Sequence, residues 1–223
     1  MTSAYGSIQS KRVASPYLEK LLPLSVGSHL YVCRVRDEHI PILRSTINHE
    51  ISIGMSFPQS EEMDEEAFSK YYLSADCFVL INDRNECLGG FYGVFHSTHI
   101  SIQKILTSPT LVKPNFPGHC SHISNGGFLV AVEYRGRGYG KILANAFLSI
   151  APLLGYKASL FNLVFVDNIV STRIWREAGF VEVGRIPRAR DNTVDALIFY
   201  SDFATHPTSS KILEEERKFL AKS

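Results

Sequence analysis

The chain has 223 residues, of which 45% are hydrophobic, and it carries 23 basic and 22 acidic side chains. This length suffices for one domain around a single core. The net charge of +1 shows no basic excess, so no nucleic acid is expected as a partner. No apolar run reaches the roughly 18 residues that a membrane span requires, so no membrane is expected either.

The N-terminal segment MTSAYGSIQSKRVASPYLEK contains no apolar stretch of the kind found in a secretory signal. A disordered tail is the first interpretation and a mitochondrial transit segment is the alternative, so we expect a cytoplasmic or, alternatively, a mitochondrial protein. The four irregularly spaced cysteines indicate reduced thiols. His119, Cys120 and His122 lie close in sequence, but no second cluster completes a tetrahedral set, so no metal is expected.

The first half of the chain reads as strands with two intervening helices. Alternation of apolar and polar residues predicts the strands, and acidic residues in a first helical turn suit the helix dipole. The expected elements are a strand at Leu30–Val35, a helix from an Asp37 cap to about Glu50, an acidic helix near Ser60–Leu73, a hairpin around the turn Asn82–Asn85 and a loop at Thr107–Gly118.

The second half has the order strand, loop, helix, strand, helix, strand, strand. The run SLFNLVFV is continuously apolar apart from Asn162, which is typical of a strand buried on both faces. The expected elements are a strand from Cys120 into a glycine loop, a helix at Tyr139–Leu154, the SLFNLVFV strand, a helix from an Asn168 cap to Gly179, two strands (FVEVGRI and VDALIFY) and a helix at Ser209–Ala221. We divide the chain into an N-terminal extension (1–28), the main domain (29–205) and a C-terminal helix that packs on that domain (206–223).

The glycine loop in VEYRGRGYGKILANAFL is suited to hold an anion. A Walker loop is disfavoured because Gly140 and Lys141 are followed by Ile142. A dinucleotide fingerprint is disfavoured by the glycine spacing and by the absence of an acid about 20 positions on. The remaining interpretation is a pyrophosphate site, in which backbone N–H groups at a helix start bind the phosphates. Arg135, Arg137 and Lys141 add positive charge.

These residues carry a family resemblance. Arg135-x-x-Gly138-x-Gly140 resembles the R/Q-x-x-G-x-G/A signature of the GNAT acetyltransferases, and Asn168 followed by WREAGF resembles their second motif. The resemblance implies an α/β (α+β) fold, with a mixed central sheet of about seven strands flanked by helices and a splayed pair of parallel strands at an acetyl-CoA site. The implied cofactor-binding residues are Val130, Val132, Arg135, Gly136, Arg137, Gly138, Tyr139, Gly140, Lys141, Asn168 and Trp175.

A closer resemblance covers Lys113–Pro187. CSHISNGGFLV, APLLGYK and FNLVFVDN are similar to segments of the fungal proline-analogue acetyltransferases, which N-acetylate L-azetidine-2-carboxylate. This implies an N-acetyltransferase that acts on the ring secondary amine of proline-like imino acids. It also implies a homodimer, because the resembling enzymes are dimeric. Two alternatives stay open: an acetyltransferase for another small amine, of the polyamine or aminoglycoside type, and a catalytically silent CoA-binding module.

The reaction that this resemblance implies is attack of a neutral amine on a thioester, which needs an oxyanion donor, a proton acceptor and an exit for the thiolate. The backbone N–H groups around Leu129 and Val130 are the expected oxyanion donors. Many family members place a glutamate base on this strand, where our sequence has no carboxylate. Trp175 stands where many have a tyrosine acid, and an indole N–H is not a useful proton source. We therefore expect catalysis mainly by positioning.

Three asparagines complete the expected site. A buried Asn162 would cost about 1–3 kcal/mol without partners. Asn162 can be a core amide, Asn125 a bulge or turn residue, and Asn168 a helix cap. The resemblance instead implies contacts with substrate and acetyl-CoA. Asn125 and Asn162 are then expected to flank the substrate, with Gly126, Gly127 and Phe128 beside it and the two glycine N–H groups receiving its carboxylate.

Overall fold

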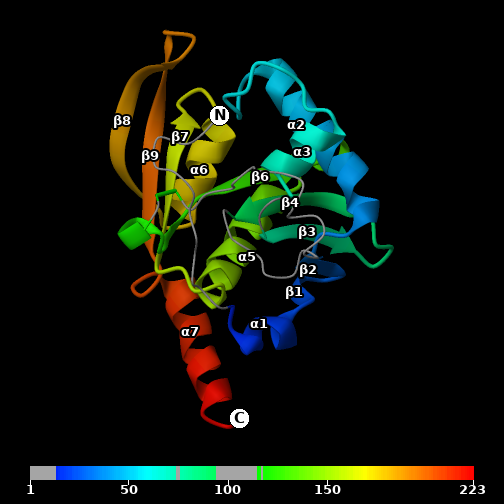
Figure 1. Ribbon diagram of the computed structural model, residues 1–223, viewed down its shortest axis with the longest axis vertical. Coiled ribbons are helices and arrows are strands. Elements are labelled where there is room, and N and C mark those ends of the chain that lie inside the picture. Colours follow the sequence, from blue (N-terminus) through cyan, green and yellow to red (C-terminus); the bar gives the residue numbers. More distant parts are fainter. Residues whose placement is uncertain (1–13, 74–75, 94–114, 117) are drawn as a thin grey trace.

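The computed structural model describes residues 14–73, 76–93, 115–116 and 118–223 (Figure 1). Its strands are β1 (Leu24–Gly27), β2 (Leu30–Arg34), β3 (Asp76–Asn82), β4 (Cys87–Gly93), β5 (Ile123–Ser124), β6 (Gly126–Val130), β7 (Ala158–Phe165), β8 (Val181–Arg190) and β9 (Val194–Asp202). Its α-helices are α1 (Pro16–Leu21), α2 (Ile40–Ile53), α3 (Glu65–Tyr71), α5 (Tyr139–Leu153), α6 (Ile169–Glu177) and α7 (Pro207–Leu220). Three 3₁₀ turns complete the described elements: η1 (Asp37–His39), η2 (Gly118–Cys120) and η3 (Val132–Tyr134).

The described strands form two sheets. The first is antiparallel, in the order β1-β2-β3-β4-β6, and the second has the order β5-β7-β9-β8, in which β5 and β7 run parallel. Only Asn125 separates β5 from β6, so the chain leaves one sheet and enters the other at this residue. Beyond it, β6 pairs with β4 and β7 with β9, so the two parallel strands part (Figure 1). The predicted fold class and the splayed strands are confirmed.

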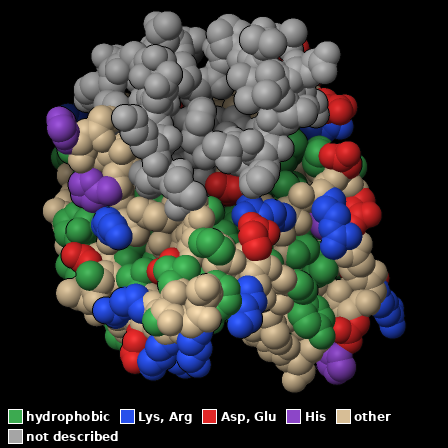
Figure 2. Space-filling model, turned by 60° about the horizontal axis from the view of Figure 1, so that its bottom comes forward, with side chains coloured by type: hydrophobic (Ala, Val, Ile, Leu, Met, Phe, Trp, Pro, Cys, Tyr) green, Lys and Arg blue, Asp and Glu red, His purple; other side chains and the backbone are tan. Residues whose placement is uncertain are grey.

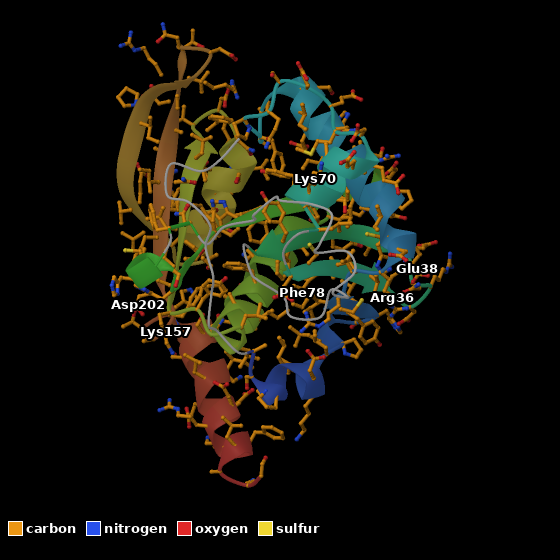
Figure 3. The ribbon with its side chains drawn as sticks, viewed as in Figure 1. Arg36, Glu38, Lys70, Phe78, Lys157 and Asp202 are labelled. Atoms are coloured by element: carbon orange, nitrogen blue, oxygen red, sulfur yellow. The ribbon has the colours of Figure 1, made fainter. Side chains whose placement is uncertain are left out.

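Helices cover both faces of the first sheet. Along β3, Phe78 and Leu80 face the core around α5, whereas Val79 and Ile81 face α2 and α3. This alternation follows from the period of two in a strand, and it explains why most of β3 is buried (Figure 3, Phe78). The five-stranded sheet is therefore the middle layer of a three-layer arrangement.

An aromatic cluster joins the two sheets beneath the point where β6 and β7 part. The ring of Phe147, in the middle of α5, lies 5.8 Å from Phe91 of β4, 5.4 Å from Phe128 of β6 and 5.7 Å from Phe161 of β7. Aromatic contacts of this kind add stability beyond the apolar area that they bury. Because α5 begins at the glycine loop, the same helix supports the loop and both sheets.

Most elements predicted from the sequence are present with shifted ends. The β3–β4 hairpin and the strand at β2 are confirmed. The acidic helix begins only after Asp64, whose Oδ1 accepts a hydrogen bond from the Ala67 N–H at 2.7 Å. Asp37 is the first residue of η1 rather than a cap. Most of the predicted loop 107–118 lies outside the described residues.

The two ends of the described chain pack on the main domain. The Ser15 N–H donates to the Leu153 carbonyl of α5 at 2.7 Å, and α1 and β1 follow, within the segment that the sequence assigns to an extension. In α7, the Ser209 hydroxyl donates to the Leu148 carbonyl at 2.7 Å, and Ile212 is buried. The division of the chain at residues 28 and 205 stays a prediction.

The distribution of charged side chains and the state of the cysteines match what the composition indicates. Figure 2 shows acidic and basic side chains interspersed on the face that it presents. All four cysteines are free, and only Cys120 is exposed. None of the helices in the described part of the chain combines the length and apolar character needed to cross a bilayer.

Candidate functional site

The glycine loop runs from η3 into α5. Gly136 has φ 75° and Gly138, the N-cap of α5, has φ 81°, which is the left-handed region where glycine is favoured. A Cβ atom at either position would meet nothing within 4 Å, so this side of the loop is open. Gly140 differs, because a Cβ there would lie 2.8 Å from Ile174 Cδ1 of α6. Gly140 therefore serves the packing of α5 against α6.

Backbone N–H groups of this loop are free to bind an anion. In the part of the chain that the structure describes, the N–H groups of residues 136–140 have no hydrogen-bond acceptor. The Lys141 N–H is the first to find one, the Gly138 carbonyl at 3.0 Å. Unpaired N–H groups at a helix start, together with the helix dipole, form an anion site. The geometry thus agrees with the predicted pyrophosphate site.

The three cations near the loop have different surroundings. Arg135 donates through Nη2 to Glu50 of α2 at 2.5 Å and through Nε to the Val130 carbonyl at 3.2 Å. The Glu50 carboxylate is only 12% exposed. Arg135 therefore ties the loop to α2 and to β6, instead of standing free for phosphate as the sequence suggests.

The other two cations stay at the surface. Arg137 donates to the Glu133 carbonyl at 3.2 Å, and its guanidinium lies over the Tyr134 ring at 5.5 Å. Lys141 forms an exposed ion pair with Glu177 at 3.1 Å. Exposed pairs of this kind contribute little and exchange readily for another anion.

Strand β6 presents alternate N–H groups to its two sides. The Ala131 N–H donates to the Leu88 carbonyl, which precedes the paired part of β4, at 3.0 Å. Hydrogen bonds alternate along an antiparallel pair, so the Leu129 N–H also faces β4 and those of Phe128 and Val130 face the gap toward β7. The Leu129 N–H, expected as an oxyanion donor, is therefore turned away from the gap, whereas the N–H of Val130, the other expected donor, faces it.

The expected carboxylate site at the two glycines is already occupied. The Gly126 N–H donates to its neighbour's side chain, Asn125 Oδ1, at 2.8 Å. The Gly127 N–H faces β4 by the same alternation as Leu129. Gly127 pairs with Tyr92, and a Cβ at Gly127 would lie 2.2 Å from the Tyr92 ring. This glycine is needed because the ring crosses the strand there, which corrects the sequence prediction.

Asn125 and Asn162 meet at the gap. Asn125 Nδ2 donates to Asn162 Oδ1 at 3.3 Å. The pairing of β7 with β9 shifts register between Phe161 and Val164, so Asn162 lies in a bulge, and it is exposed. The prediction that β7 is buried on both faces is wrong at this residue, because the bulge lifts it from the ladder. No burial cost therefore has to be offset there.

Two serines join the strands beside this pair. Ser124 Oγ donates to the Ala158 carbonyl at 3.1 Å, and Ser159 Oγ donates to the Ser124 carbonyl at 3.2 Å. Both serines are fully buried. These bonds fix the short parallel contact from which Asn125 projects.

The side chains of Asn168 and Trp175 both have hydrogen-bond partners within the protein. Asn168 Oδ1 accepts from the Ser171 N–H at 3.0 Å, and its Nδ2 donates to Ser56 Oγ at 3.0 Å. The Trp175 indole donates to Ser171 Oγ at 3.0 Å, and the ring packs on Phe128. Trp175 is buried, so its expected cofactor contact does not fit, whereas Asn168 is a cap that lies at the end of β7.

The sequence reasoning missed a pair of phenols. Tyr92 Oη donates to Tyr71 Oη at 2.8 Å, beside Gly127. Burial, and then the neighbouring Tyr71, hold the pKa of Tyr92 well above its ordinary value, so it stays protonated and remains a donor. The two tyrosines are 21 positions apart, and only the Gly126-Gly127 pair signals that a side chain approaches this strand closely.

Other features of the described residues do not join this site. A separate cavity of about 500 Å³ lies between η1, the hairpin turn and η3, lined among others by His39 and Cys87. No three His, Cys, Asp or Glu side chains of the described residues come together as metal ligands. Near the gap, His122 Nδ1 lies 3.0 Å from the His119 carbonyl.

Comparisons with known proteins agree with this geometry. A family model described as "Acetyltransferase (GNAT) family" matches residues 45–180. N-acetyltransferase aca1 of Schizosaccharomyces pombe is 34% identical over 173 residues, which cover 75% of this chain and 82% of that protein. Protein SPT10 of Saccharomyces cerevisiae is 27% identical over 214 residues, and the match spans 80% of this chain but only 33% of SPT10.

Solved structures share the fold. A GCN5-related N-acetyltransferase from Kribbella flavida has a TM-score of 0.65 at 23% identity, covering 78% of this chain and 98% of its own. Spermidine N-acetyltransferase from Vibrio cholerae, solved with CoA and spermine, has a TM-score of 0.60 at 18% identity, covering 84% and 99%. The family match and the 34% identical relative establish that this chain belongs to the GNAT family of acetyltransferases.

Proposed function

We propose that this chain transfers the acetyl group of acetyl-CoA to the ring secondary amine of a small proline-like imino acid such as L-azetidine-2-carboxylate. The observation that carries the choice of acceptor is the Asn125–Asn162 pair at the mouth of the gap between β6 and β7. Two amides hydrogen-bonded to each other, on a bulge and at a strand break, suit a small polar acceptor. The resemblance of the surrounding segments to the proline-analogue acetyltransferases supports the same choice.

The loop geometry supports the cofactor part of the proposal. Free N–H groups at residues 136–140 would bind the pyrophosphate, and Arg137 and Lys141 would add charge. The pantetheine arm would enter the gap along β6. There it would meet the outward N–H groups of Phe128 and Val130. Asn168, at the end of β7, would border the arm.

Chemistry in the gap would rest on positioning. The neutral acceptor amine attacks the thioester carbonyl, and negative charge develops on the carbonyl oxygen. Collapse of this intermediate would break the C–S bond and release CoA as the thiolate, while the amine proton passes to solvent water. The Phe128 N–H, which faces the gap, would stabilise this oxyanion, because a fixed backbone dipole needs no reorganisation. Asn125 and Asn162 would orient the amine, and holding both reactants in place supplies most of the rate.

The alternatives differ in acceptor and in turnover. A polyamine-type enzyme would acetylate spermidine, and a silent CoA-binding protein would bind acetyl-CoA without releasing CoA. Thiol release should be measured with L-azetidine-2-carboxylate, with spermidine and without acceptor. Release that requires the imino acid is the expected result. Release with spermidine alone, or none with any acceptor while acetyl-CoA binds, would overturn the proposal.

A homodimer is part of the proposal. Strand β8 is the edge of the second sheet in the order of the described strands, and its Val181 and Val183 are 62% and 53% exposed. An edge strand with apolar side chains is a surface suited to pairing with a second copy.

A further inference from the structure

We infer that the Tyr71 hydroxyl, oriented by Tyr92, binds the carboxylate of the acceptor and makes Tyr71 a specificity-determining residue. This inference rests on the proposed function, because it assigns a contact within the same acceptor site. It also fills the role that Gly126 and Gly127 cannot take.

The two phenols lie beside the start of β6, close to the asparagine pair. Gly127 and Leu129 point to the same side of β6, because side chains alternate along a strand, and Leu129 belongs to the core under α2 and α3. Asn125 immediately precedes β6 and stands two residues before Gly127. Tyr92 is the direct partner of Gly127 and belongs to the same core. Tyr71 is the last residue of α3, next to Lys70, which is labelled in Figure 3. An acceptor held by Asn125 therefore has Tyr71 and Tyr92 as its neighbours.

The hydrogen bond between the phenols leaves one donor for a ligand. The Tyr92 O–H donates to the Tyr71 oxygen at 2.8 Å, which leaves the Tyr71 O–H available to donate to a ligand. Tyr92 is only 8% exposed and its ring is seated over Gly127, whereas Tyr71 is partly exposed. A hydroxyl that already accepts a hydrogen bond is a stronger donor, and a carboxylate is the strongest neutral-pH acceptor that an imino acid offers.

Tyr72 shows what a tyrosine outside this site looks like. Its ring is fully buried, stacks on Phe68 at 5.1 Å and meets Tyr92 edge-on at 4.7 Å. Its hydroxyl is buried without a hydrogen-bond partner among the described residues. Tyr72 thus offers a matched control, since it adjoins Tyr71 and touches Tyr92 but its hydroxyl is buried.

The test compares Y71F, Y92F and Y72F with the unchanged protein on two acceptors. L-azetidine-2-carboxylate carries the carboxylate, and L-azetidine-2-carboxamide replaces it with a neutral amide. We expect Y71F to lower kcat/KM for the carboxylate about 10- to 100-fold, the range for a hydrogen bond to a charged group, and to change the carboxamide much less. Y92F should also lower kcat/KM for the carboxylate, by a smaller factor than Y71F. Y72F should leave both acceptors and the KM for acetyl-CoA unchanged.

The two acceptors separate failure of this inference from failure of the proposed function. If the unchanged protein acetylates L-azetidine-2-carboxylate but Y71F lowers both acceptors equally, or neither, Tyr71 does not bind the carboxylate. If the unchanged protein acetylates neither, the proposed function fails. In that case, calorimetry measures how tightly the two acceptors bind to the CoA-bound unchanged protein and to CoA-bound Y71F. The inference is overturned if the two proteins prefer the carboxylate over the carboxamide to the same extent, or if neither protein prefers it.

Discussion

Asn125 and Asn162 are hydrogen-bonded across the gap at 3.3 Å, and each stands at an irregularity of its strand. Asn125 is the single residue between β5 and β6, and Asn162 lies in the bulge of β7. Irregular strand positions free a side chain from the regular packing of a sheet and are common next to active sites. The two irregularities face each other, so together they place two amides at the mouth of the gap.

Replacing Asn162 with alanine should reduce turnover without affecting stability. The side chain is exposed, so the free energy of unfolding should change by no more than an ordinary surface substitution, about 0.5 kcal/mol. The melting temperature should therefore be nearly unchanged. Loss of a positioned group at a reacting centre costs on the order of 10²-fold in kcat. Steady-state kinetics with each substrate varied, alongside thermal melts, check this. The exposed Asn145 of α5, replaced with alanine, is the control, and a comparable kcat for both variants would contradict the assigned role.

Replacing Gly138 with glutamate should abolish acetyl-CoA binding. The new carboxylate would repel the phosphates, and the left-handed backbone adds a strain of about 1–2 kcal/mol. Gly118, the first residue of η2, has φ 56° and equally open surroundings, so G118E carries the same strain in the segment before β5. Calorimetry should detect acetyl-CoA binding by G118E and none by G138E. Binding by a folded G138E would show that the loop is not the phosphate site.

Asn168 should affect both stability and the cofactor. N168A removes the α6 cap, which costs about 1 kcal/mol and should lower the melting temperature by roughly 2–4 °C. N168D keeps the capping oxygen but loses the donor to Ser56 and adds a negative charge. We expect a raised KM for acetyl-CoA in both variants and a normal melting temperature only in N168D. An unchanged KM in N168D would leave Asn168 a structural cap.

Strand β8 should mediate the dimer. V183E places a charge on its exposed face and should shift the mass in light scattering toward the monomer at micromolar concentration. Leu220, 48% exposed at the end of α7, gives the matched control L220E, which should leave the mass unchanged. A monomeric unchanged protein, or a dimer that survives V183E, would contradict this assignment.

The cysteines should differ in reactivity. Burial raises the pKa of Cys87 to about 11, so at pH 8 only about one thiol in a thousand is ionised. The thiolate fraction rises with pH until that pKa is reached, and so should the alkylation rate. Peptide mapping after iodoacetamide treatment at pH 8 should therefore find Cys120 modified first and Cys87 late. Rapid early labelling of Cys87 would show that its strand opens readily.

The sequence predicted the elements that local patterns encode. The turn at Asn82–Asn85 separates two apolar runs, and the glycine loop precedes a long apolar helix, so both were placed correctly. The bulge at Asn162 was not predictable, because it arises from pairing with β9 rather than from the run SLFNLVFV itself. A polar residue within an apolar run was the only local sign.

The functional residues also divide into those that a local motif reveals and those that only tertiary packing brings together. The loop glycines follow from a motif, whereas Tyr71 and Tyr92 come together only when α3 packs on β4. Trp175 was misplaced because its indole finds a partner one turn earlier, at Ser171, which a motif position does not reveal. The occupied N–H of Gly126 likewise depends on the conformation of the preceding side chain.

The ring of Phe147 has a consequence for the width of the gap. It touches Phe91 and Phe128 of one sheet and Phe161 of the other, directly beneath the gap. Cores are packed as tightly as organic crystals, so the volume of this ring fixes how far apart the sheets stand. A smaller residue at position 147 would let the gap between β6 and β7 narrow, and a larger one would widen it. The spacing of the strands on either side of the gap is thus tied to a core ring that belongs to both sheets.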